Sequence, residues 1–110
     1  MASLFEKGSL FVCKPVRIKY LIEPADSFKL QASFSVPKRR FKLAVHRNKL
    51  KRKLREVHRL HQHSIKKSLV DSKIKISILY IYSRTEILDY NTIEKAILPF
   101  YKELLDKVQS

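Results

Sequence analysis

The chain has 110 residues, 45% of them hydrophobic, and 24 Lys and Arg against 10 Asp and Glu, a formal net charge of +14 at pH 7. This length predicts one domain over residues 1–110 with enough apolar residues for a core. Its longest apolar run, Ile78 to Tyr82, is far shorter than the about 20 residues of a membrane helix. The single glycine, Gly8, excludes a glycine-rich phosphate loop, and the single cysteine, Cys13, excludes an internal disulfide. With no secretion signal at its start, the chain is expected to be cytoplasmic.

Three segments are predicted to be β-strands. Residues 16–22 and 28–36 alternate between apolar and polar side chains, which is typical of strands buried on one face. A hairpin-like turn is expected over 23–27, and Pro37 ends the second strand. Residues 74–82 are apolar on both faces, which favours a central position in the sheet.

Two helices are predicted between and after these strands. From about residue 42 to 63 a narrow apolar stripe recurs at helical spacing, formed by Leu43, Leu50, Leu54 and Val57. The second helix is expected from about Asn91 to Val108, with Asn91 as N-cap, Glu94 completing a capping box and Pro99 producing a kink. Its expected buried residues are Ile93, Ile97, Phe100, Leu104 and Leu105. The element order describes a small α/β sandwich.

The charge is concentrated in the first of these helices and the turn before it. Residues 38–67 contain 13 Lys or Arg and one acid, Glu56, so 12 of the 14 excess charges lie in this stretch. A solvated helix usually interleaves acidic partners, which are nearly absent here. The basic side chains share one face, opposite the apolar stripe, and a phosphate backbone is the natural partner of such a face. It comprises Asn48, Arg52, Arg55 and Arg59, with Arg47 near the edge of the stripe.

No group in the chain predicts catalysis. Ser35 and Lys38 have the spacing of an acyl-transfer motif, but its companion motifs are missing and the serine ends a strand. His61 and His63 fall on different faces of a helix, which argues against a metal site, so the histidines are expected to face phosphate or solvent. The carboxylates are scattered, and Cys13 is expected to be a packing residue.

The segment from Ser35 to Arg59 resembles the bacterial ribonuclease P protein subunit. That family has a Ser-x-x-Lys strand end followed by a helix of the pattern Ala-Val-x-Arg-Asn-Arg-x-Lys-Arg-x-x-Arg-Glu. Ala44-Val45 begins the matching helix, whose six polar matches are Arg47, Asn48, Lys51, Arg52, Arg55 and Glu56. Lys49 departs from the pattern because it replaces an arginine and loses bidentate reach. Little of the family's first helix precedes Gly8.

The resemblance implies a subunit of a ribonucleoprotein endonuclease that removes the 5′ leader from precursor tRNA. The RNA subunit and its bound Mg²⁺ perform the hydrolysis, and the protein supplies neither catalytic residues nor metal ligands. The implied contacts to the catalytic RNA are Arg47, Asn48, Lys49, Lys51, Arg52, Arg55 and Arg59. The implied contacts to the single-stranded leader are Phe5, Arg17, Lys19, Lys38 and Arg39.

The fold implied by the resemblance is an α+β two-layer sandwich. Its mostly antiparallel sheet has about four strands, and a left-handed β-α-β crossover is expected, against the usual right-handed preference. The alternative function is a structural RNA-binding protein of the ribosomal kind, which would share the size and charge. DNA binding by a helix-turn-helix is not expected, because the basic helix has no second short helix beside it.

Overall fold

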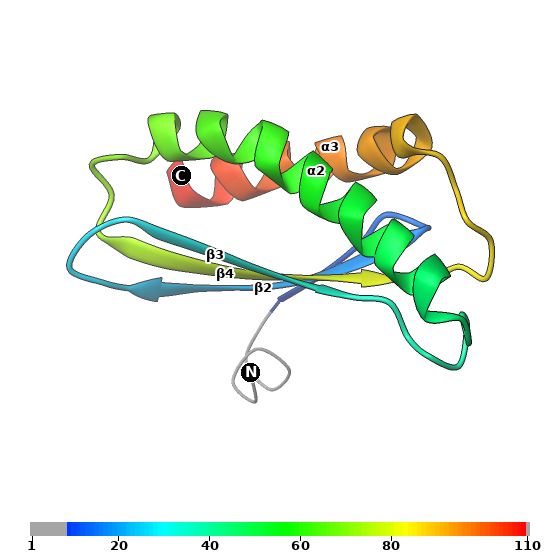
Figure 1. Ribbon diagram of the computed structural model, residues 1–110. Coiled ribbons are helices and arrows are strands. Elements are labelled where there is room, and N and C mark those ends of the chain that lie inside the picture. Colours follow the sequence, from blue (N-terminus) through cyan, green and yellow to red (C-terminus); the bar gives the residue numbers. More distant parts are fainter. Residues whose placement is uncertain (1–8, 110) are drawn as a thin grey trace.

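A computed structural model describes residues 9–109 as a four-stranded sheet with two helices on one face (Figure 1). The strands are β1 (Ser9–Val12), β2 (Val16–Pro24), β3 (Lys29–Ser35) and β4 (Ile74–Tyr82). The helices are α2 (Ala44–Ser68) and α3 (Tyr90–Gln109). This two-layer α+β arrangement confirms the predicted fold class.

The strand order is β1-β2-β4-β3, so β4 lies between β2 and β3. It pairs antiparallel with β2 along its whole length, from Val16 opposite Tyr82 to Pro24 opposite Ile74, and parallel with β3. The predicted hairpin-like turn over 23–27 is therefore wrong, because β2 and β3 do not pair with each other. The doubly apolar β4 gains more by burial between two strands than the half-polar β3, which lies at the sheet edge.

Because β3 and β4 are parallel, α2 forms the crossover between them. The left hand of this crossover remains a prediction of the resemblance. Strand β1 was not located from the sequence, since its four residues are mostly exposed and have no clear alternation of burial. It pairs antiparallel with the start of β2 across a short turn at Lys14, whose φ is +60°.

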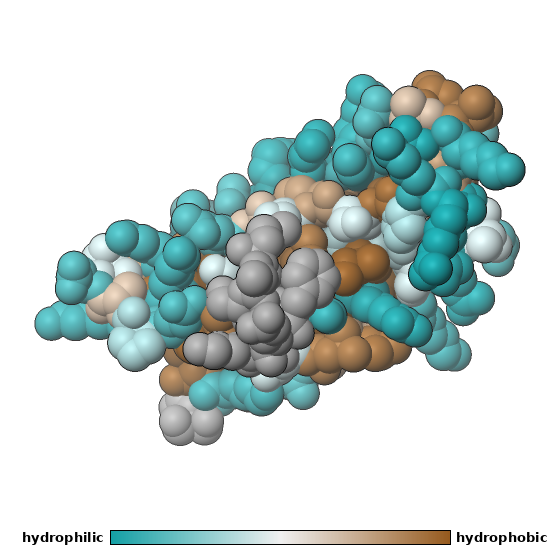
Figure 2. Space-filling view, turned by 90° about the horizontal axis from the view of Figure 1, so that it is seen from below, coloured by the Kyte–Doolittle hydropathy of each residue, from teal (hydrophilic) through white to brown (hydrophobic). Residues whose placement is uncertain are grey.

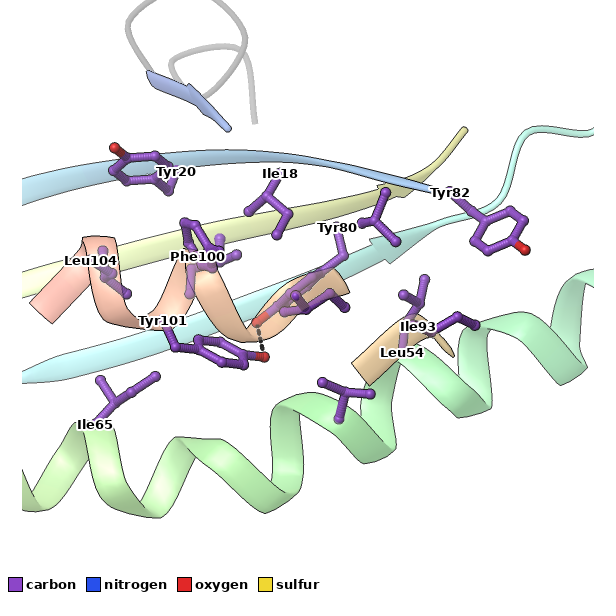
Figure 3. Close-up of a cluster of buried hydrophobic side chains, with 14 of the residues drawn as sticks. Ile18, Tyr20, Leu54, Ile65, Tyr80, Tyr82, Ile93, Phe100, Tyr101 and Leu104 are labelled. Carbon is purple, nitrogen blue, oxygen red and sulfur yellow. Dashed lines mark hydrogen bonds between the residues drawn. The ribbon is translucent and has the colours of Figure 1, made fainter. Parts of the chain in front are cut away.

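The core lies between the sheet and the two helices (Figure 3). Strand β2 contributes Val16 and Ile18, and the aromatic side chains Tyr80, Tyr82 and Phe100 are fully buried. The predicted stripes are confirmed for most positions of both helices. Their buried members are Leu50, Leu54, Val57 and Ile65 of α2 and Ile93, Ile97, Phe100, Tyr101 and Leu104 of α3, while Leu105 is partly buried.

The predicted helix ends need three corrections. Leu43 is 59% exposed instead of buried, because it lies one residue before α2 in extended backbone and is not on the helical wheel. Asp89, not Asn91, caps α3, since its Oδ1 accepts a hydrogen bond from the Thr92 amide at 3.0 Å. Glu94 does not complete a capping box; it contacts His61 and Tyr90 instead.

Candidate RNA-binding surface

The basic face of α2 (Asn48, Arg52, Arg55 and Arg59) is exposed along its length. It lies opposite Leu50, Leu54 and Val57, which are completely buried against the sheet and α3. Packing of the apolar stripe therefore holds the arginines toward solvent, at spacings of three and four residues that place them in a row. Guanidinium groups can each bind phosphate oxygens through two parallel hydrogen bonds.

The other predicted RNA contacts lie along the borders of this face. Lys49 is exposed, and Lys51 is half-buried. Sequence reasoning missed the continuation of α2 to Ser68, which adds exposed Lys66 and Lys67 beyond the end expected near residue 63. The long helix thus extends the basic surface toward its C-terminus.

Arg47 binds the backbone just before α2. Its Nη1 donates hydrogen bonds to the carbonyl oxygens of Phe41 at 2.7 Å and Lys42 at 2.9 Å. Phe41 is itself buried in the core, so this guanidinium joins the turn after β3 to the first turn of the helix. The first turn of α2 has no acidic residue and no side-chain cap, which leaves the positive end of the helix dipole available to an anion.

Two arginines of the basic face have partners within the protein. Arg59 forms a salt bridge with Glu56, and its Nε donates to Oε2 of that carboxylate at 3.1 Å. The hydrogen bond raises the pKa of Arg59 and lowers the pKa of Glu56. The Arg55 guanidinium lies 5.8 Å from the ring centroid of Phe34 in β3. These contacts orient the two side chains while leaving them exposed.

Two of the histidines that were expected to face phosphate or solvent contact other side chains of the protein instead. His58 is buried, and its Nδ1 is 2.9 Å from the Tyr80 hydroxyl, which is 2.8 Å from the hydroxyl of Tyr101. Burial lowers the pKa of His58 to about 4, helped by the nearby charge of Lys66, so the imidazole is neutral at pH 7. His61 stacks on Tyr101 and contacts Glu94, with Nε2 and Oε2 3.1 Å apart.

Two of the five predicted leader-binding residues lie on the sheet face opposite the helices. Arg17 is exposed and Lys19 half-buried on this face of β2, which Figure 2 shows as a mixture of polar and apolar areas. In the sheet register, Ile81 of β4 lies between Arg17 of β2 and Ser35 of β3. Lys19 lies opposite Leu79 of β4. Lys38 and Arg39 are exposed in the turn that follows β3. Phe5 lies outside the described residues.

This face is not uniformly basic. Leu79 is 3% exposed between Lys19 and Ser33, and Ile81 separates Arg17 from Ser35. At the sheet edge Leu10 and Val12 are more than half exposed. The surface therefore combines two cations with apolar side chains, which suits contact with both phosphates and base rings.

Side chains that could ligate a metal ion do not cluster within the described residues. Within 9–109 no group of three or more His, Cys, Asp or Glu side chains could hold a metal ion. Cys13 donates its thiol to the Val16 carbonyl at 3.1 Å, and burial raises its pKa to about 11, so it is no ready nucleophile. Over the same residues, neither helix has both the length and the apolar character needed to span a membrane.

Comparison with known proteins identifies the family of this chain. Residues 2–105 match the family model of ribonuclease P. Two ribonuclease P protein components, from two strains of Porphyromonas gingivalis, are each 32% identical over 96 residues, which cover 86% of this chain and 70% of the relative. The chain belongs to the ribonuclease P protein family.

Solved ribonuclease P proteins have the same fold. A mutant protein from Staphylococcus aureus with defective mRNA degradation activity superposes with a TM-score of 0.69 at 19% identity, covering 94% of this chain and 80% of that one. The ribonuclease P protein from Thermotoga maritima gives 0.69 at 21% identity, with 93% and 88% covered. All residues of the motif from Arg47 to Glu56 lie within α2 of this chain.

Proposed function

We propose that the chain is the protein component of a ribonuclease P and binds the RNA subunit through the basic face of α2. The observation that supports this most strongly is the row of exposed arginines on that face, held outward by a fully buried apolar stripe. Only one acidic residue, Glu56, lies within residues 38–67. A surface of this kind binds a phosphate backbone and releases counterions.

In this proposal the second RNA partner is precursor tRNA, whose single-stranded 5′ leader lies across the sheet face opposite the helices. Arg17 and Lys19 contact the leader there, and Lys38 and Arg39 contact it beyond the end of β3. Hydrolysis is assigned to the RNA subunit and its Mg²⁺, as the family resemblance implies. The assembly works in the cytoplasm.

Reconstitution tests this function. The purified full chain is mixed with a bacterial ribonuclease P RNA and a 5′-extended precursor tRNA at low Mg²⁺, and cleavage at the mature 5′ end is measured. Stimulated cleavage is expected, with no cleavage by the protein alone. RNA binding without stimulation would contradict the proposal and favour a structural RNA-binding protein.

A further inference from the structure

One pocket on the described part of the chain is lined by none of the predicted RNA-contact residues. It has a volume of about 660 Å³, between the β1–β2 turn, the loop after β4 and the first turns of α3. Its walls are largely apolar, including Phe11, Leu88 and Pro99. The Phe11 ring packs on Phe100 with centroids 5.5 Å apart, so its position is set by the core.

Cations surround this apolar interior. Lys14, Arg84 and Lys95 line the pocket against a single carboxylate, Glu86, and all four are exposed. None of the three cations forms a salt bridge within residues 9–109. A flat apolar ring bearing an anionic group would match both the walls and the charge.

The α3 wall also offers a hydrogen-bond acceptor. Pro99 has no amide hydrogen, so it cannot donate to the carbonyl of Lys95 four residues earlier, as a helical residue normally does. Lys95 and Pro99 both line the pocket, and this carbonyl lies between them on the same helix face. An amino group on a ring edge is a natural donor to it.

The opposite wall is fixed to the end of β4. Ser83 donates its amide to the Pro15 carbonyl at 2.8 Å and its hydroxyl to the Lys14 carbonyl at 2.9 Å. These bonds hold Lys14 in the left-handed backbone region that non-glycine residues rarely occupy. The pocket is therefore formed before any ligand arrives.

The pocket is joined to the basic helix. Lys53 of α2 donates its Nζ hydrogen to the Leu88 carbonyl at 2.7 Å, and Leu88 lines the pocket. The pocket wall therefore contacts the helix that carries the basic face. We infer that this pocket receives one unpaired nucleotide of the bound RNA, with its base between Phe11 and Pro99 and its phosphate at Lys14, Arg84 and Lys95. This inference rests on the proposed function for the source of the nucleotide.

The test uses AMP as the probe and the full chain without RNA. In a titration followed by NMR, AMP is expected to shift the amide resonances of Cys13, Thr92 and Ala96. Ribose 5-phosphate, which lacks the base, is expected to bind at least about fivefold more weakly, the lower end of the contribution of one stacked base. Equal binding of the two, or of inorganic phosphate, would overturn the base assignment.

Variants locate the site. The double variant Arg84→Ala with Lys95→Ala should weaken AMP binding, and Ala96→Trp, which fills the pocket, should abolish it. Lys102→Ala is the matched control, because it removes an exposed lysine of the same helix outside the pocket. Far-ultraviolet circular dichroism checks folding, and if Ala96→Trp does not fold the double variant decides. Equal effects of the control and the double variant would overturn the proposal.

A second readout separates this inference from the proposed function. In the reconstituted complex the double variant should bind the ribonuclease P RNA several-fold more weakly than Lys102→Ala. If cleavage is stimulated but AMP shifts no pocket resonance, the pocket proposal fails alone. If AMP binds as expected but reconstitution gives no stimulation, the proposed function fails and the assignment of the nucleotide to ribonuclease P RNA fails with it.

Discussion

The hydroxyl of Tyr80 lies 2.9 Å from Nδ1 of His58, joining the central strand β4 to the buried side of the basic helix. The same hydroxyl is 2.8 Å from that of Tyr101 in α3 (Figure 3), so one polar chain links β4, α2 and α3. Among the described residues, no buried side-chain nitrogen or oxygen lacks a hydrogen-bond partner. A satisfied polar chain in an apolar core favours one rotation of α2, the one that presents its arginines to solvent.

Removal of the shared hydroxyl should therefore cost stability. Tyr80→Phe leaves both His58 and the Tyr101 hydroxyl without a partner, and the expected loss is about 1–3 kcal/mol in the free energy of unfolding. Tyr101→Phe is the control, since Tyr80 keeps its bond to His58 and the loss should be smaller. Urea denaturation measures both variants, and a larger loss for Tyr101→Phe would contradict the central role of Tyr80.

The free energy of unfolding should also decrease as the pH is lowered, because of His58. Its pKa is lowered by burial to about 4 from 6.5, so the unfolded chain binds a proton at higher pH than the folded one. This contribution is complete above about pH 6.5 and is lost as the pH falls toward 4. Hydrogen bonds from Arg59 and Thr92 lower the pKa of Glu56 and Asp89, which adds a loss of the same sign at lower pH.

Chemical denaturation at several pH values checks this dependence. Between pH 7 and pH 5 the wild-type chain should lose stability, while His58→Gln should show a flatter profile over the same interval. Both profiles should then fall below pH 5 as the carboxylates protonate. Parallel profiles for the two proteins throughout would rule out His58 as the titrating group.

Arg52→Ala should weaken RNA binding without affecting the fold. Arg52 is exposed on the basic face, so its loss is expected to cost about 1–3 kcal/mol of RNA affinity if the contact is desolvated. Because a phosphate contact is removed, the slope of log affinity against log salt should also become shallower by about one. Filter binding at several salt concentrations measures this, with Lys102→Ala as control; an unchanged affinity and slope would remove Arg52 from the interface.

Arg47 should behave differently from Arg52. It bonds two carbonyls before α2, so Arg47→Ala is expected to lower the free energy of unfolding by about 1 kcal/mol as well as weakening RNA binding. Arg52→Ala should change stability by less than about 0.5 kcal/mol. Thermal or urea unfolding of both variants decides, and equal stability would show that Arg47 acts on RNA alone.

The leader should be recognised by length more than by sequence. Holoenzyme affinity for precursor tRNA is expected to rise between leaders of one and five nucleotides, as backbone contacts to Arg17 and Lys19 accumulate. Arg17→Ala and Lys19→Ala should each reduce that rise, whereas Lys102→Ala should not. If neither variant changes the dependence on leader length, the leader lies on another surface.

Much of this protein follows from local sequence pattern. The alternation of apolar and polar side chains predicted β2 and β3, and the apolar residues on both faces of β4 predicted a central strand. Burial of one or both faces of a strand determines which positions along it are apolar. The charge of residues 38–67 and the helical spacing of its arginines predicted the basic face, whose residues are exposed on α2. These are properties of single segments.

Relations between segments were decided only by the tertiary structure. The insertion of β4 between β2 and β3 depends on which strand gains most by central burial, so a hairpin predicted from the intervening turn was wrong. His58 sits at a helix position that the sequence placed among basic residues, yet Tyr80 and Phe34 from the sheet surround it and make it a core residue. The pocket at α3 likewise combines residues up to 88 positions apart, Phe11 and Pro99, which no local pattern connects. A contact between distant residues depends on how the elements pack, and packing minimises the exposed apolar area of the whole chain rather than of any one segment.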